Sequence, residues 1–332
     1  MSYKVYPWQL STWAMLKQQQ DKMHHAILLS GEQGIGKQHF ANTLAQSLLC
    51  QQPSQEGFAC GECQSCDWFS NQTHPDFKLV SAENDDEDDD KKSTSKKTQI
   101  SVHQIRTLND FLGLSSHQGK KVVLITPAED MNLAATNALL KMLEEPPNNA
   151  FFILVSHSSK RLLATIRSRC QQVNMQCPDS EIGQRWLKQE GLSVSSQQLR
   201  YVGGSPLKAI QQENYDDCMR LVKSLMDGRL MDISQAVNFC QSIGMAKSVD
   251  VLQKWLHDLL STTNNLPARY HEISAEKLTT LAKQLEPSRG FDLLDQLNYF
   301  RRHAQHPLNQ ELQFESICLN YTKIFKEAAR CN

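Results

Sequence analysis

The sequence predicts a mixed α/β fold, in which a phosphate-loop domain with a mainly parallel sheet precedes a long run of helices. Three observations support this prediction. A glycine-rich loop, GEQGIGKQ at residues 31–38, lies between a short apolar run and an amphipathic stretch. Other short apolar runs alternate with helical patterns up to about residue 176, as in parallel sheets that helices cover on both faces. Beyond that point the patterns are helical throughout.

The first strand and helix enclose the glycine-rich loop. The strand is predicted at residues 26–30, AILLS, and the helix begins at Lys37. In a phosphate loop, glycines let backbone N–H groups surround a phosphate, the lysine contacts its oxygens, and a following Ser or Thr holds Mg²⁺. Gln38 stands in place of that hydroxyl residue. The candidate nucleotide-binding residues are Gly31, Gly34, Gly36 and Lys37.

The second strand is predicted at residues 121–126, KVVLIT. In an ATP-hydrolysing site this strand should end in an acidic pair that holds Mg²⁺. Here Thr126 and Pro127 occupy those positions, and the next acidic residues follow only beyond the proline. Because Gln38 removes the other Mg²⁺ ligand, we expect no magnesium site and no intrinsic ATP hydrolysis. ATP binding stays open, since backbone N–H groups can hold a phosphate without a metal.

The remaining elements of this domain continue the alternation of strands and helices. Ser101 is the predicted N-cap of an amphipathic helix that precedes the second strand. A helix over residues 132–145 follows that strand and is stopped by two prolines. A third strand is predicted at residues 151–156, and a short helix at residues 161–170.

Four of the ten cysteines lie close together, with the spacing C-x9-C-x2-C-x2-C. In a chain with no export signal, they are expected to be thiols or metal ligands rather than disulfides. Four thiolates suit tetrahedral Zn²⁺ and leave no open position, so the sequence predicts a structural zinc module at residues 50–66. The alternative is a cluster of free thiols. The predicted ligands are Cys50, Cys60, Cys63 and Cys66.

Residues 81–97, SAENDDEDDDKKSTSKK, form a charged segment that lacks apolar side chains after Ala82. Such a segment cannot bury enough apolar surface to fold, so it predicts a flexible acidic loop. A metal-binding acidic cluster is the alternative, but the segment lacks the turn residues that would shape a coordination site.

Composition excludes several functional classes. A formal net charge of −1 over 332 residues argues against a strong autonomous nucleic-acid binder. The chain contains no run of 18 apolar residues, and its first residues carry no apolar signal segment. We therefore expect a cytoplasmic protein with no membrane partner.

The second half of the chain predicts helical domains. Residues 177–212 carry a few short helical patterns, and residues 213–332 carry apolar stripes typical of a helical bundle. No cluster of convergent polar side chains is evident in this bundle, so it is interpreted as a scaffold or assembly module.

Taken together, the motifs resemble the clamp-loader subunits of the bacterial replicative DNA polymerase, DNA polymerase III. The resemblance spans residues 7–210 and rests on the cysteines, THPDF, ATNALLKMLEEPP and LLATIRSRC. The degenerate loop is similar to that of delta-prime subunits rather than to the ATP-hydrolysing gamma and tau subunits. The resemblance implies an AAA+ P-loop domain at residues 1–176, a small helical lid at 177–212 and a C-terminal helical collar for oligomerisation at 213–332.

The resemblance also implies roles and partners. In this family a Ser-Arg-Cys motif, here at residues 168–170, carries an arginine finger, so Arg169 is the candidate catalytic residue for a neighbour's ATP site. Leu207 replaces the family's sensor arginine, which also counts against hydrolysis. The implied partners are the gamma/tau motor subunits and the delta subunit in a hetero-pentamer. The sliding clamp and primer-template DNA would be reached through that complex.

Other interpretations remain open at this stage. The chain could be an ATP-hydrolysing motor subunit, although the missing acids count against it. It could be a zinc-dependent nucleic-acid-binding module, but GECQSCDWF offers aromatic residues with little positive charge. A small-molecule phosphate-loop kinase would need the same missing Mg²⁺ ligands. Considered alone, Arg169 could be an ordinary salt-bridging arginine.

Overall fold

The computed structural model describes residues 5–19, 23–82, 99–117, 119–271, 275–302 and 310–326. The predicted acidic loop falls almost wholly on residues 83–98, which lie outside the described residues. Contacts divide the chain into two compact units, Met1–Glu190 with Ser205–Lys208, and Gly191–Gly204 with Ala209–Asn332. The further division into a lid at 177–212 and a collar at 213–332 stays a prediction.

The first unit contains a five-stranded sheet in which every neighbouring pair is parallel. In spatial order the strands are β2 (Phe77–Ser81), β3 (Lys121–Thr126), β4 (Ala150–Ser156), β1 (Ala26–Ser30) and β5 (Gln171–Asn174). This topology confirms the predicted α/β fold class. The three inner strands match the three predicted strands, β4 starting one residue earlier.

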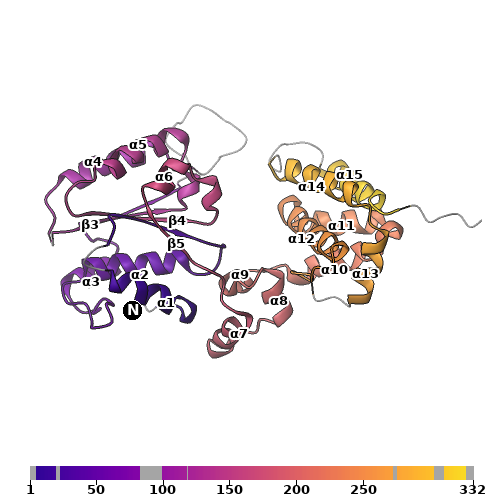
Figure 1. The fold of residues 1–332 in the computed structure, drawn as a ribbon, viewed down its shortest axis with the longest axis horizontal. Coiled ribbons are helices and arrows are strands. Elements are labelled where there is room, and N and C mark those ends of the chain that lie inside the picture. The colour runs from indigo at the N-terminus through magenta and orange to yellow at the C-terminus, as the bar shows by residue number, and fades with distance from the viewer. Residues whose placement is uncertain are drawn as a thin grey trace, which may run out of the picture. The chain divides into compact units, whose positions relative to one another are not determined.

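Helices cover both faces of this sheet (Figure 1). One face carries α1 (Leu10–Gln18), α2 (Lys37–Leu49) and α3 (Gln64–Ser70), and the other carries α4 (Val102–Gly113), α5 (Leu133–Glu144) and α6 (Ala164–Ser168). Successive side chains of β1 point to opposite faces. Accordingly, Leu29 packs in a core with Phe40 of α2, whereas Leu28 packs in a second core with Leu139 of α5.

Side-chain caps fix where the helices on the second face begin. Ser101 Oγ accepts a hydrogen bond from Gln104 N at 3.3 Å, and Gln104 Oε1 accepts one from Ser101 N at 2.9 Å. This reciprocal capping box confirms Ser101 as the N-cap of α4. Asn132 caps α5 in a similar way by accepting from Ala135 N at 2.8 Å.

The structure also describes several short elements that contribute residues to the candidate site or lie close to it in sequence. They are η1 (Pro7–Gln9), η3 (Ala128–Asp130), η4 (Ser159–Arg161), α7 (Ser180–Gln189) and α9 (Pro206–Ile210).

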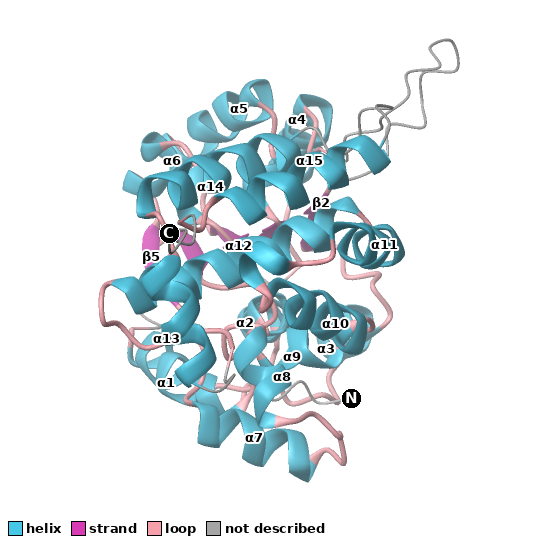
Figure 2. Ribbon diagram, turned by 90° about the vertical axis from the view of Figure 1, so that its right-hand side faces the viewer, coloured by secondary structure: helices cyan, strands magenta, loops and turns pink. Residues whose placement is uncertain are grey.

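The second unit is helical in the part that the structure describes (Figure 2). Its elements are α8 (Ser196–Tyr201), α10 (Tyr215–Leu225), η5 (Gly228–Leu230), α11 (Ile233–Ile243), α12 (Met245–Thr263), α13 (Ala275–Gln284), α14 (Pro287–Arg302) and α15 (Gln310–Lys323). The central helix α12 contacts α10, α11, α13 and α14. Buried Trp255 Nε1 donates to Tyr321 Oη at 2.7 Å, and that hydroxyl donates to Leu225 O. None of the described helices combines the length and apolar character needed to cross a membrane.

Candidate functional site

The loop between β1 and α2 has a backbone that only glycine adopts easily. Gly34 and Gly36 have φ angles of 82° and 86°. A Cβ atom on Gly34 would lie 2.6 Å from Lys208 Cβ, and one on Gly36 would lie 2.5 Å from the ring of Tyr6. Both glycines therefore allow other parts of the chain to approach the loop closely.

The chain's own donors bind the carbonyl oxygens of this loop one after another. Lys37 Nζ donates to the carbonyls of Gly31 at 2.8 Å and Glu32 at 2.6 Å. The next carbonyls accept from Ser205 Oγ (2.6 Å, to Gln33 O), Leu207 N (3.1 Å, to Gly34 O), and Trp8 Nε1 and Gln9 Nε2 (both 2.9 Å, to Ile35 O). The loop is thus fixed from η1 on one side and from residues 205–208 on the other.

Lys37, the lysine of the phosphate loop, is 2% exposed. Burial lowers the pKa of its ammonium group to about 8, although the charges of Glu129, Cys177 and Glu32 act in the opposite direction. An ammonium group that serves a bound phosphate must face the ligand. This one is directed at two carbonyls of its own loop.

β3 ends at Thr126, as predicted, and this residue is buried. The last position of the strand is therefore not acidic. Glu129 lies beyond Pro127 in η3, and its Oε1 accepts a hydrogen bond from His157 N at 2.8 Å. Burial and the charge of Lys37 both lower the pKa of His157. Sequence reasoning did not place Glu129 near the loop. The 3-10 turn after the proline returns it there, close enough to favour the charged form of Lys37.

The four predicted cysteines come together at the other end of α2. Their ligand sulfurs all lie within 4.8 Å of one another, and the Sγ distances include 3.5 Å for Cys50–Cys60 and 3.9 Å for Cys60–Cys66. A zinc ion bound at about 2.3 Å from each sulfur holds the sulfurs about 3.8 Å apart in a tetrahedron. The cluster could therefore bind Zn²⁺, with no open position for a substrate.

Contacts of Trp13 attach the cysteine module to α1. The indole Nε1 of Trp13 donates to Glu56 O at 3.0 Å, and its ring stacks on Phe58 at a centroid distance of 4.5 Å.

Burial opposes ionisation of Cys63, but backbone N–H groups of Gln51 and Cys66 outweigh it and lower the pKa of this thiol to about 6. A thiolate of this kind suits a metal ligand. Since α2 spans about 20 Å by its rise per residue, the module is well separated from Lys37.

Arg169 follows the last residue of α6, and its side chain is 35% exposed. Its Nη2 forms an ion pair with Glu144 Oε1 at 2.6 Å, at the end of α5. Its Nη1 donates to Thr165 O at 3.1 Å and reaches Ser168 Oγ at 3.5 Å. The structure therefore does not place Arg169 among the candidate residues of the chain's own phosphate loop.

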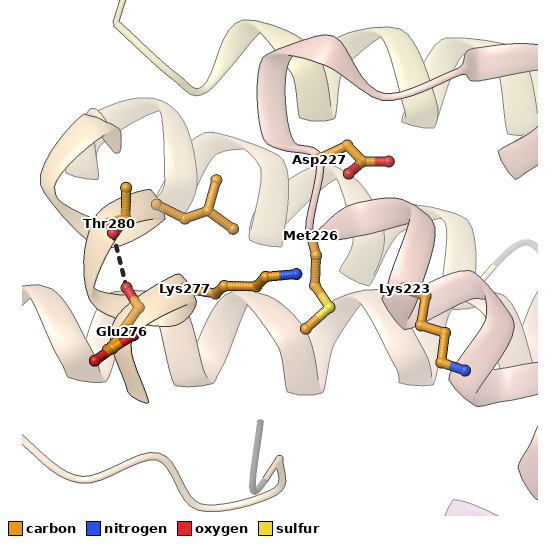
Figure 3. Close-up of a pocket in the computed structure, with 7 residues that line it drawn as sticks. Lys223, Met226, Asp227, Glu276, Lys277 and Thr280 are labelled. Atoms are coloured by element: carbon orange, nitrogen blue, oxygen red, sulfur yellow. Dashed lines mark hydrogen bonds between the residues drawn. The ribbon is translucent and has the colours of Figure 1, made fainter. Parts of the chain in front are cut away.

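A cavity of about 680 Å³ lies in the second unit, between the end of α10 and α13 (Figure 3). Its charged residues balance, with Lys223 and Lys277 opposed by Asp227 and Glu276. Thr280 Oγ1 uses its hydrogen bond within α13, where it donates to Glu276 O at 2.8 Å. The cavity contains none of the predicted site residues, and its mixed charge favours neither an anion nor a cation.

Comparison with known proteins identifies the family. A family model described as "DNA polymerase III, delta subunit" matches residues 8–179. The chain is 40% identical over 210 residues to DNA polymerase III subunit delta' of Pseudomonas aeruginosa, an alignment that covers 62% of this chain and 60% of that protein. It is 30% identical over 334 residues to the Escherichia coli subunit delta', covering 95% of this chain and 94% of that protein.

Among solved structures, a DNA polymerase III gamma subunit-related protein from Thermotoga maritima aligns with a TM-score of 0.41 and 16% identity. That alignment covers 95% of this chain and 99% of the Thermotoga chain. The family match over the first unit and the near full-length alignment with the Escherichia coli protein agree on the assignment. The chain belongs to the DNA polymerase III subunit delta-prime family.

Proposed function

We propose that this chain is the non-hydrolysing stator of a DNA polymerase III clamp loader, and that it supplies Arg169 to the ATP site of a neighbouring subunit. In this role it works in the cytoplasm, in a hetero-pentamer with gamma/tau motor subunits and a delta subunit. The complex would load the sliding clamp onto primer-template DNA.

The observation that carries the proposal is the lysine of the phosphate loop, which is buried and donates to two carbonyls of the loop itself. All the carbonyls from Gly31 to Ile35 accept hydrogen bonds from this chain, and Lys37 is buried among them. Contact of Lys37 with a bound phosphate would require its ammonium group to leave two carbonyls of the loop. This arrangement supports a rigid role in place of a nucleotide cycle.

The metal positions support the same proposal. Gln38 stands where the Mg²⁺-binding hydroxyl should be, and buried Thr126 stands where the first acid should be. Glu129, the first acid beyond β3, lies past Pro127 in η3 and not at the end of the strand. These features count against a gamma/tau-type motor and against a small-molecule kinase.

Arg169 has the properties that a finger acting on another subunit requires. It is partly exposed, it is always charged, and a guanidinium presents several donors in a rigid fork that matches phosphate oxygens. Zinc at the cysteine module would then be structural, because four cysteines fill its coordination sphere. The zinc-dependent nucleic-acid-binding alternative has no supporting observation beyond the cysteines themselves.

The proposal is tested by reconstituting the full chain with its motor and delta subunits and by measuring clamp-stimulated ATP turnover and clamp loading. Arg169→Ala should lower ATP turnover severalfold and clamp loading further, with the complex still assembled. Trans-acting fingers contribute about 10³–10⁵-fold in small GTPases, but only one of several ATP sites would receive this one.

Two variants make the result specific. Arg169→Lys should restore little activity, because a point charge cannot reproduce the guanidinium fork. Lys37→Ala should leave ATP turnover of the complex unchanged, since the proposed role makes no use of a nucleotide on this chain. A complex carrying Arg169→Ala that loads clamps at the unmutated rate would refute the finger. Phosphate release by the isolated chain that Lys37→Ala abolishes would refute the non-hydrolysing role.

A further inference from the structure

The corner between α5 and α6 holds the Arg169 guanidinium from two sides. Glu144, the last residue of α5, contacts Nη2 at 2.6 Å. Thr165 O and Ser168 Oγ, both on α6, contact Nη1 at 3.1 Å and 3.5 Å. The acceptors on α6 hold only Nη1. The carboxylate on α5 forms an ion pair at Nη2 and so adds a contact from a second helix.

These contacts leave donors available for a ligand. A guanidinium has five N–H donors. Both hydrogen bonds use Nη1, and Nη2 forms the ion pair, so no hydrogen bond of Nε or Nη2 is found among the residues that the structure describes. Two such donors can bind a phosphate in the bidentate manner typical of arginine while the Glu144 contact persists.

We propose that Glu144 is a positioning residue that holds the Arg169 fork in the orientation in which it meets the neighbour's ATP. This inference rests on the proposed trans-acting role of Arg169. The pair is partly exposed on both sides, at 35% and 49%, so it contributes little to the stability of the fold. The ion pair already restricts the rotamers of Arg169 before the phosphate binds. Arg169 therefore loses less conformational entropy on binding.

The adjacent glutamate provides a matched control. Glu145 carries the same charge on the next residue and is exposed, and no ion pair or hydrogen bond of its carboxylate is found among the described residues. A general electrostatic effect of the α5 terminus would involve both glutamates. A positioning effect would involve Glu144 alone.

The test measures ATP turnover by the reconstituted loader, with kcat and KM determined separately. Glu144→Ala should lower kcat up to about fivefold, which corresponds to about 1 kcal/mol, and leave the KM for ATP unchanged. Glu144→Gln should recover only part of the rate, because it keeps the length of the side chain and an oxygen near Nη2 but loses the charge of the ion pair. Glu145→Ala should have no effect. In an Arg169→Ala background, Glu144→Ala should cause no further loss.

The outcomes separate this inference from the proposed function. If Arg169→Ala slows the loader but Glu144→Ala does not, Glu144 has no positioning role and the finger stands. If Glu144→Ala slows the loader equally with and without Arg169, the glutamate acts through another group and the inference is wrong. If Arg169→Ala itself has no effect, the proposed finger is wrong and the inference fails with it.

A measurement on the isolated full chain tests the contact without the complex. The NMR relaxation of the Arg169 Nε–H group should indicate a more ordered side chain in the unmutated protein than in Glu144→Ala, and Glu145→Ala should match the unmutated protein. Equal order in Glu144→Ala and the unmutated protein would overturn the proposed positioning.

Discussion

Lys37 and Arg169 are two cationic side chains of the same unit that are used in opposite ways. Lys37 is 2% exposed and donates to two carbonyls of its own loop. Arg169 is 35% exposed and is held at the surface by Glu144 and α6. The residue that the phosphate-loop motif reserves for catalysis is therefore turned inward, and a residue outside that motif is presented outward.

Under the proposed function, this difference indicates how a phosphate-loop fold can keep its architecture without the chemistry of an ATPase. The parallel sheet and α2 form the core. The Mg²⁺ ligands have no such role in the core, so they can be lost without loss of the fold. In the proposed function, the chain contributes Arg169, a partly exposed arginine at the end of α6.

The largest expected effect comes from removing the zinc site at the end of α2. It tests whether the position of Lys37, at the start of the same helix, depends on that site. Cys63→Ser should abolish binding of one Zn²⁺ per chain, measured by elemental analysis of freshly purified protein. It should destabilise the module by several kcal/mol. This is less than the roughly 10–16 kcal/mol of isolated zinc-finger peptides, because the Trp13 contacts also hold the module.

Hydrogen exchange should then show whether the backbone around Lys37 or that around Arg169 depends on the cysteine module. Amides of residues 51–63 and of α3 should lose protection, those at the start of α2 should lose less, and those of α6 should not change. Cys177→Ser removes a half-buried thiol outside the cluster and should leave the zinc content intact. Zinc-free purified wild-type protein, prepared without chelators, would exclude the zinc site.

The next largest effect tests whether Lys37 is truly inward-facing. Burial lowers its pKa from 10.5 to about 8, so between these values the unfolded chain holds this proton more tightly than the folded chain. Lys37 therefore makes the free energy of unfolding rise with pH across that window, and its destabilising contribution is complete below pH 8. The rise is on the order of 3 kcal/mol.

Urea unfolding between pH 7.5 and 10.5 measures this rise as the difference between wild type and Lys37→Met. The difference should change by most of that amount over the window. Lys188→Met, at an exposed lysine of α7, should run parallel to wild type. A Lys37→Met curve that also runs parallel to wild type would mean that Lys37 is exposed in solution and available to a ligand.

Much of the fold could be predicted from the sequence, because the inner strands and the long helices carry strong patterns. The apolar runs of β1, β3 and β4 are buried along nearly their whole length, which makes them easy to recognise. The edge strands β2 and β5 were not predicted. Their sequences, FKLVS and QQVN, mix apolar with polar residues because each pairs on one side only.

The candidate site was predicted less evenly. The close spacing of the four cysteines was sufficient to predict their cluster, because short loops can bring them around one ion. The closure of the phosphate loop was not predicted, because its donors Ser205 and Leu207 are remote in sequence and reach Gln33 and Gly34 only after folding. Leu207 was noted only as a missing sensor arginine, but its backbone N–H is what binds the loop.

The smallest expected effect is on stability, and it concerns Arg169. An exposed ion pair contributes at most about 1 kcal/mol, so Arg169→Ala should change the free energy of unfolding by about that amount or less. For a unit of this size, the corresponding shift in Tm is about 2–4 °C at most. Thermal unfolding of Arg169→Ala and Glu145→Ala, measured side by side, checks this expectation with a neighbouring exposed residue as reference.

A loss of several kcal/mol for Arg169→Ala would mean that the arginine supports the α5–α6 corner. A slower loader could then reflect a damaged subunit instead of a missing finger. With stability preserved, any loss of ATP turnover in the assembled complex can be assigned to the guanidinium itself.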